Sequence, residues 1–258
     1  MESINFERSY PLGKDFETIK GRAYQYLAHY LGDFDLMSFS RQEHAVKFSS
    51  ACLIPHKKTG RPRVMFLLNN PHPASIQQGM FLAPEKEGRQ RPFWHFMEES
   101  GWFDINVEES TPETLKESFL EVDYNSAFEI LFHCYYPFPV EQPEHTGKIF
   151  GKSFLKKVID PQSRDEFVES LSIHLVSFVL AFSKQVYNSV AEEKVGAYQE
   201  KLDSGELIKS RVALGNGDVP IYLTYPPGWR SKRNYRDLRV ESLRLIREDI
   251  LASFPEAA

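Results

Sequence analysis

The sequence predicts an α/β fold, a three-layer α/β/α sandwich around a short, mostly parallel central sheet. Short, continuously apolar segments alternate with helix-like segments along most of the chain. Continuous apolarity is typical of strands buried on both faces, and strands that alternate with helices favour parallel pairing. The chain has 258 residues, 41% of them hydrophobic, which is enough for a sizeable core. We expect a single domain over residues 1–258, with a helix-rich part at 1–60 and the core at 61–258.

The first elements follow from apolar spacing and from stop signals. Residues from about Phe16 to Leu31 have apolar side chains at three-and-four spacing and predict a helix, which Gly32 ends. The short apolar run Val64–Leu68 predicts the first strand of the sheet. Pro92–Ser100 predicts a second helix with aromatic residues on one side.

Three further strands and a terminal helix complete the expected fold. Phe128–His133 is the second strand, and Leu175–Phe182 is the third, although a buried helix of that length would have the same pattern. The fourth strand, Val219–Tyr225, follows a glycine-rich turn. A basic amphipathic helix is expected over about Lys232–Leu251.

Composition excludes several classes of protein. The two cysteines, Cys52 and Cys134, form no CxxC pair, which excludes a disulfide framework, a four-cysteine zinc site and an iron–sulfur cluster held by this chain alone. No HExxH-like spacing occurs, so we expect neither a metal nor a cofactor. The net charge of −5 disfavours nucleic-acid binding through diffuse charge.

The chain also lacks signals for membranes. Its N-terminus does not have the layout of a signal peptide, and no apolar stretch approaches the roughly 20 residues that a bilayer requires. We therefore expect a cytoplasmic protein without membrane contact, acting as a monomer.

Polar side chains follow the ends of the predicted strands. Ligand sites of open parallel sheets lie at the carboxyl ends of the strands, so these side chains are the candidate site residues. They are Asn69, Asn70 and His72 after the first strand, His133 and Cys134 at the second, Ser183 after the third, and the residues from Tyr225 to Arg230 after the fourth. Neither a GxSxG elbow nor a GxGxxG loop follows a strand.

The stretch from Val64 to Phe81 combines an apolar strand, an Asn-Pro pair, and a Gln and a Gly ahead of a Phe. It resembles the first motif of the uracil-DNA glycosylase superfamily, most closely the single-strand-selective monofunctional branch. Three more segments resemble later motifs of that family, in the same order: Phe132–Pro137, Leu175–Lys184 and Leu223–Pro227. The resemblance extends from Val64 to about Ile250.

The resemblance implies a monofunctional, metal-free DNA glycosylase that flips a base out of DNA and hydrolyses its N-glycosidic bond. Asn70 matches the residue that orients the attacking water. An asparagine suits this role, because its amide oxygen accepts a hydrogen bond without ionising. Phe81 matches the aromatic platform for the flipped base. His72 replaces a glycine of the family and would contact base, sugar or phosphate, while Asn69 and His133 are further substrate-binding candidates. The competing interpretations are a simple turn at Asn70 and core packing for Phe81.

Two departures from the family pattern concern substrate and mechanism. Cys134 occupies the position of the uracil-reading Asn and cannot offer its paired donor and acceptor. Tyr225 occupies the position of the leaving-group His, and a phenol with an ordinary pKa of about 10 is a weak acid. We therefore expect excision of a modified pyrimidine, which by resemblance to phage-defence members could be glucosylated hydroxymethylcytosine. Plain uracil excision and a catalytically inactive DNA-binding protein remain the alternatives.

A basic cluster with an interleaved tryptophan follows the fourth strand. It is predicted to grip the DNA backbone and to wedge open the gap left by a flipped nucleotide, a solvated helix face being the alternative. Its members are Trp229, Arg230, Lys232, Arg233 and Arg236.

Overall fold

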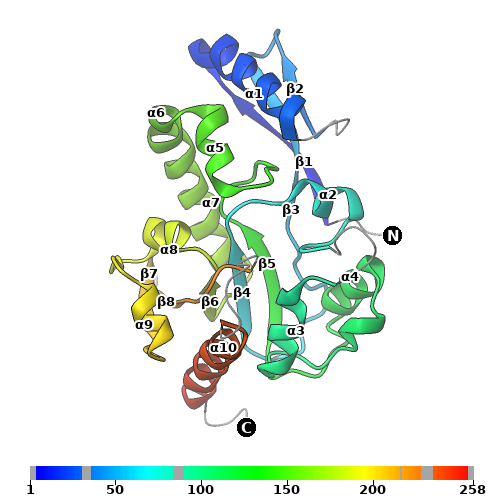
Figure 1. Cartoon of the computed structure of the whole chain (residues 1–258), viewed down its shortest axis with the longest axis vertical. Helices are drawn as coiled ribbons and strands as arrows, with labels where there is room; N and C mark the ends of the chain where they lie inside the picture. The colour runs from blue at the N-terminus through cyan, green and yellow to red at the C-terminus, as the bar shows by residue number, and fades with distance from the viewer. Residues whose placement is uncertain (1–3, 31–35, 84–89, 216, 228–234, 255–258) are drawn as a thin grey trace.

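A five-stranded, mostly parallel sheet forms the centre of the computed structural model, which describes residues 4–30, 36–83, 90–215, 217–227 and 235–254 (Figure 1). The strand order is β5-β4-β6-β8-β7, and the bounds are β4 (Arg63–Leu68), β5 (Glu129–Cys134), β6 (Phe178–Ala181), β7 (Ile208–Leu214) and β8 (Gly217–Leu223). β4, β5, β6 and β8 pair in parallel, and β7 pairs antiparallel with β8 at the edge. The predicted α/β class and mostly parallel sheet are confirmed.

Helices connect the parallel strands. Those between β4 and β5 are α2 (Pro73–Gln78), α3 (Pro92–Glu99) and α4 (Pro112–Glu121), with the 3-10 turn η3 (Val107–Glu109). Those between β5 and β6 are α5 (Pro143–Phe150), α6 (Lys152–Phe154), the π-helical turn η4 (Leu155–Ile159) and α7 (Asp160–Ile173). α8 (Lys184–Val190) and α9 (Gln199–Asp203) lie between β6 and β7, and α10 (Tyr235–Ala252) follows β8.

Prolines mark the start of several helices. α2, α3, α4 and α5 each have a proline in their first turn. The proline ring fixes φ near the helical value, and the missing N–H has no partner in the first turn of a helix anyway. These four prolines therefore mark where the helices begin.

Both faces of the sheet are buried. Met65 and Leu67 of β4 belong to one apolar cluster, with Phe167 of α7 and Val186 of α8. The alternate β4 side chains, such as Phe66, belong to a second cluster built with residues from α3, α4 and α10. All six residues of β4 are buried, and the five that follow Arg63 are apolar, as expected for a strand covered on both faces.

The expected helix-rich N-terminal part is wrong in one respect. The predicted helix is confirmed as α1 (Phe16–Tyr30), after a short 3-10 turn, η1 (Gly13–Asp15), but a three-stranded antiparallel sheet lies beside it. Its strands, in the order β1-β3-β2, are β1 (Asn5–Pro11), β2 (Met37–Ser40) and β3 (Ala45–Ala51). β1 and β2 are edge strands with exposed polar side chains, so they lack the apolar run that reveals a doubly buried strand.

The N-terminal sheet packs onto the core through aromatic rings. The ring centroids of Tyr10 and Phe48 lie 5.4 and 4.4 Å from that of Phe138, in the segment after β5. All three residues belong to the same buried cluster as Met65 of the central sheet. The two sheets therefore share one apolar core.

Strand limits differ most at β6. The sequence predicts that Leu175 begins this strand, but the residue has φ of 53° and is 68% exposed, in the turn that follows α7. The strand itself begins at Phe178. Among the described residues, no helix combines the length and the apolar character that a membrane crossing requires.

Candidate functional site

The carboxyl ends of β4 and β6 form a topological switch point. The chain leaves β4 toward β5 on one side and leaves β6 toward β7 and β8 on the other side. Connections that diverge in this way open a crevice beyond the strand ends, where ligands bind in open α/β sheets. The Asn69 side chain crosses this point, because its Nδ2 donates to Oγ of Ser183 at 3.2 Å.

The side-chain amide of Asn70 is held in one orientation. Its Nδ2 donates to the carbonyl oxygen of Phe138 at 3.1 Å and to Oγ1 of the buried Thr146 at 3.0 Å. Because a backbone carbonyl can only accept, the nitrogen must face Phe138 and the oxygen must face away. Within the part of the chain that the structure describes, Oδ1 of Asn70 is buried and has no hydrogen-bond partner.

The side-chain amide of Asn69 resembles that of Asn70 in leaving its oxygen unpaired, although its nitrogen donates to a hydroxyl, which fixes the orientation less firmly than a carbonyl does. Its Oδ1 is also buried and is not hydrogen bonded to any described residue. An unsatisfied buried acceptor costs about 1–3 kcal/mol, so two of them on consecutive residues at a switch point indicate a site built to receive donors from a ligand or a water. The structure thus brings together two of the predicted site residues, Asn69 and Asn70.

His72 lies beside this pair as a neutral hydrogen-bond donor. Its Nδ1 accepts from the backbone N–H of Ala74 at 3.2 Å, capping α2. When neutral it therefore carries its proton on Nε2. Burial, together with the charge of Arg91, lowers the pKa of His72 to about 4. At neutral pH the imidazole can donate a hydrogen bond from Nε2, but it supplies no positive charge.

Phe81 and Cys134 belong to the core instead. The Phe81 ring is 2% exposed and stacks on Phe132, with centroids 5.5 Å apart and an interplanar angle of 21°. Cys134 is 5% exposed, pairs in register with Leu68, and belongs to the same apolar cluster. Burial raises the pKa of its thiol well above the usual range, so it is a small neutral side chain. The geometry favours core packing over a stacking platform for Phe81.

His133 lies on the opposite face of the sheet from Cys134. Its Nδ1 is 3.8 Å from Sγ of Cys52, and its ring is 6.2 Å from that of Phe167 in α7. Successive strand residues point to opposite faces, so His133 and Cys134 cannot line one pocket. The expectation that both contact the substrate is corrected for this reason.

Acidification is expected to destabilise the fold through His133. Burial and the charge of Arg8 lower its pKa to about 4, so between pH 6.5 and about 4 the unfolded chain binds a proton that the folded chain excludes. The free energy of unfolding should therefore fall as the pH falls through this window. The contribution of one such histidine is up to about 1.4 kcal/mol per pH unit.

Urea denaturation of His133→Gln at several pH values measures this effect. The variant should lose that part of the pH dependence, whereas His44→Asn, at an exposed position, should keep it. Equal slopes for His133→Gln and the unmodified protein between pH 4 and 6.5 would contradict a neutral His133.

Tyr225 is already engaged in a strong hydrogen bond. Its hydroxyl donates to Oδ1 of Asp203 in α9 at 2.6 Å. Burial and the Asp203 carboxylate raise its pKa well above the ordinary value. Tyr225 is thus a weaker acid than a free phenol, and it must leave Asp203 before it can donate to a departing base.

The predicted C-terminal helix is confirmed as α10, but the basic cluster predicted to grip DNA lies mostly before it. Trp229, Arg230, Lys232 and Arg233 lie outside the described residues. Arg236 pairs with Glu99 at 2.8 Å, and Arg244 pairs with Glu241 at 2.7 Å. Arg239 is buried with its guanidinium carbon 5.3 Å from the ring centroid of Phe96. Within the described part of this region, these three arginines therefore have partners in the protein.

A cavity of about 660 Å³ lies at the other end of the strands, at their amino-terminal edge. Its lining includes Lys58, Arg61, Glu129, Leu175 and Phe254. This is the wrong edge for the ligand site of a parallel sheet, and it is remote from Asn69 and Asn70 at the far end of β4.

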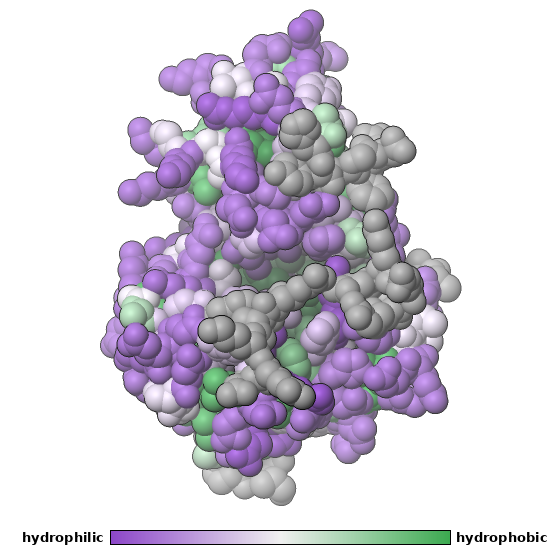
Figure 2. Space-filling model, in the orientation of Figure 1, coloured by the Kyte–Doolittle hydropathy of each residue, from purple (hydrophilic) through white to green (hydrophobic). Residues whose placement is uncertain are grey.

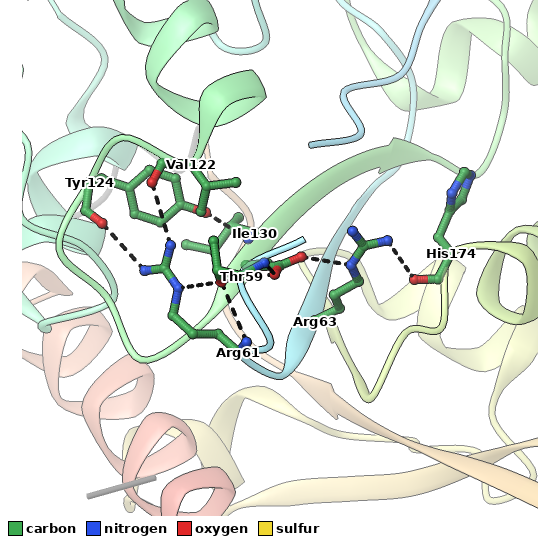
Figure 3. Close-up of polar contacts among 8 residues, drawn as sticks. Thr59, Arg61, Arg63, Val122, Tyr124, Ile130 and His174 are labelled. Atoms are coloured by element: carbon green, nitrogen blue, oxygen red, sulfur yellow. Dashed lines mark hydrogen bonds and ion pairs between the residues drawn. The ribbon is translucent and has the colours of Figure 1, made fainter. Parts of the chain in front are cut away.

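The arginines of that edge serve the fold (Figure 3). Arg61 donates to Oγ1 of Thr59 and to the Ser126 carbonyl, both at 2.8 Å. Arg63 donates through Nε to Oε2 of Glu129 at 2.7 Å and through Nη1 to the His174 carbonyl at 3.0 Å. Sequence reasoning missed this network, although the Arg-Pro-Arg triplet directly before the first buried strand is its signal.

No family model matches the chain, and no curated protein matches it. Function is therefore inferred from the strand-end geometry and from the motifs. Within the described ranges, no group of three or more His, Cys, Asp or Glu side chains is arranged to hold a metal ion.

Proposed function

We propose that this protein is a monofunctional DNA glycosylase that hydrolyses the N-glycosidic bond of a flipped, modified pyrimidine and leaves an abasic site. The observation that supports it most is the Asn70 amide, whose nitrogen is tied to Phe138 and Thr146 while its buried Oδ1 stays unpaired at the switch point. Under this proposal the fold is a three-layer α/β/α sandwich, and the protein acts on DNA as a cytoplasmic monomer without metal or cofactor.

The fixed amide suits the chemistry of base excision. The bond between C1′ and the base breaks with its electron pair leaving on the base, while water forms the new bond to C1′ and gives up a proton that ends on the departing base. An oxygen that accepts from that water holds it in line with C1′ and needs no ionisation. Under this proposal the neutral His72, whose proton is on Nε2, donates to the departing base or to the sugar.

The acceptor on Asn69 supports a cytosine-derived base. Its Nδ2 donates a hydrogen bond to Ser183, so under this proposal its Oδ1 accepts from the ligand. A cytosine-type base offers an exocyclic amino group that such an oxygen can accept from, whereas uracil offers a carbonyl at that position. Glucosylated hydroxymethylcytosine, a cytosine with a bulky 5-substituent, is therefore the first substrate to test.

One observation favours a second candidate, a DNA-binding protein without catalysis. The bond from Tyr225 to Asp203 ties up the side chain that matches the family's leaving-group residue. A site that binds a flipped base but lacks a donor for it would recognise DNA without cutting it.

The deciding experiment uses a panel of DNAs that contain no modification, uracil, hydroxymethylcytosine or glucosylated hydroxymethylcytosine. Released base is identified by mass spectrometry, and abasic sites are detected by alkaline cleavage. We expect release from a modified cytosine and none from unmodified DNA. Equal release from uracil DNA would favour uracil excision, and tight binding without any abasic product would establish the non-catalytic candidate and reject the proposal.

A further inference from the structure

We propose that a lysine surface on the α5–η4 segment binds the DNA backbone next to the candidate site. This surface is defined by Arg22 of α1, Lys148 of α5, Lys152 of α6, and Lys156 and Lys157 of η4. The proposal deepens the proposed function, on which its choice of DNA as the partner rests.

The sequence of this segment carries charge of one sign. Residues 145–159 include four lysines and no aspartate or glutamate. Asp160, the first acid after them, accepts the Tyr136 hydroxyl at 2.6 Å through Oδ1, so it is committed to an interior contact. The acid before them, Glu144, lies at the start of α5. A chain with a net charge of −5 thus concentrates positive charge here.

The cations of the lysine surface have no carboxylate partners among the described residues. All five side chains belong to exposed residues. Across the described ranges none of them makes an ion pair, in contrast to Arg236 and Arg244 of α10, which do. Their full charge is therefore available to a ligand from solution.

The fold holds these like charges close together. The Nη1 atom of Arg22 lies 2.6 Å from the point where a Cβ on Gly151 would be, so the guanidinium sits against the glycine that precedes Lys152. Gly151 also has φ of 81°, which favours glycine. Lys156 and Lys157 follow Lys152 by four and five residues, one turn along the α and π helical segments, and so lie on the same side as it.

Unpaired like charges at one-turn spacing destabilise a helix slightly, and an anion with closely spaced charges relieves that repulsion. A nucleic-acid backbone is such an anion, with one phosphate per roughly 3.4 Å along each strand.

The lysine surface and the candidate site share helix α5. α5 carries Thr146, which accepts from Asn70, and Lys148 and Lys152 follow two and six residues later. Lys148 is about 3 Å from Thr146 along the helix axis but points to the exposed side of α5, whereas Thr146 points inward to Asn70. α1, α5 and α6 lie together at one end of the molecule (Figure 1), where the visible surface is largely hydrophilic (Figure 2).

Salt-dependent binding to unmodified DNA tests this surface. The triple variant Lys152→Ala, Lys156→Ala, Lys157→Ala is compared with a control of equal charge loss, Lys57→Ala, Lys201→Ala, Lys209→Ala, whose lysines pair with Glu121, Glu206 and Asp249. Fluorescence anisotropy is recorded with single- and double-stranded oligonucleotides from 50 to 200 mM salt, and thermal melting checks that each variant is folded.

We expect the triple variant to bind at least about tenfold more weakly at 100 mM salt. The slope of log K against log salt on duplex should shrink in magnitude by about 0.9 for each phosphate that the variant no longer neutralises, to a total of about 2–3. The control should keep the slope of the unmodified protein. An unchanged slope in the triple variant, or an equal change in the control, overturns the proposal, as does lysine-dependent binding to anionic lipid vesicles without binding to DNA.

This test does not depend on base release. A lysine-dependent salt slope together with no abasic product on any DNA would retain the surface and reject the glycosylase. If the triple variant binds unmodified DNA normally and the protein still releases base, the lysine surface is rejected and the glycosylase is retained.

Discussion

Asn70→Ala is expected to lower the single-turnover rate of base release by about 100-fold or more, with DNA affinity changed by less than about threefold. Alanine removes the buried Oδ1 that would accept from the attacking water, while the contacts to the backbone of the DNA stay in place. The rate is measured on the best substrate of the DNA panel with enzyme in excess, so that product release does not limit it.

Thr146→Val serves as the graded companion to this variant. It keeps Asn70 but removes one of the two acceptors that fix its amide, so we expect an intermediate loss of rate of about tenfold. Asn188→Ala, which removes a hydrogen-bonded amide in α8, should leave the rate unchanged. A rate for Asn70→Ala within about twofold of the unmodified protein would remove the water-orienting role.

Glu129→Ala is expected to lower the free energy of unfolding by about 3–5 kcal/mol. Glu129 is 1% exposed, and it accepts from Nε of Arg63 and from both the backbone N–H and the hydroxyl of Thr59. Its loss leaves the buried Arg63 guanidinium without its counter-ion at the start of the central strand. Urea denaturation monitored by circular dichroism measures the change.

Two comparisons separate the charge effect from packing. Glu129→Leu combined with Arg63→Met should be less destabilised than Glu129→Ala, because no buried charge is left unpaired. Glu206→Ala, which breaks an exposed pair with Lys201, should cost less than about 1 kcal/mol. A loss under about 1 kcal/mol for Glu129→Ala would show that the Arg63–Glu129 pair does not stabilise this edge.

The sign of the pH dependence follows from the same pair. Burial opposes ionisation of Glu129, but the hydrogen bonds from Thr59 and Arg63 outweigh it and lower its pKa. The stabilisation is therefore complete above the ordinary carboxyl pKa and is lost as the pH falls through the lower folded value.

Sequence patterns predict the elements whose burial is symmetric. β4 and β5 are recognisable as apolar runs because both of their faces are buried, and α1 and α3 are recognisable by their spacing. The edge strands β1, β2 and β7 carry exposed polar side chains. They therefore lack the continuous apolar run that would predict a strand. Several amphipathic helices, such as α4 and α7, were also missed.

The candidate site could be predicted only as far as chain order determines it. Asn69 and Asn70 follow β4 directly, so their place at the strand end was predictable. The sequence does not show on which face of the sheet the His133 side chain lies, because the two faces cannot be told apart in a continuous apolar run. The partners of Tyr225 and Arg236, which are Asp203 and Glu99, come from distant segments, and no local pattern predicts such contacts.

The three-way attachment of Asn69 has a consequence for how the site is kept in shape. Its carbonyl accepts from the backbone N–H of Tyr136 after β5, and its side chain holds Ser183 after β6, while the residue itself directly follows β4. Three neighbouring strands thus set the position of the chain at Asn70. The amide is preorganised before any ligand arrives, so little binding energy is lost in ordering it.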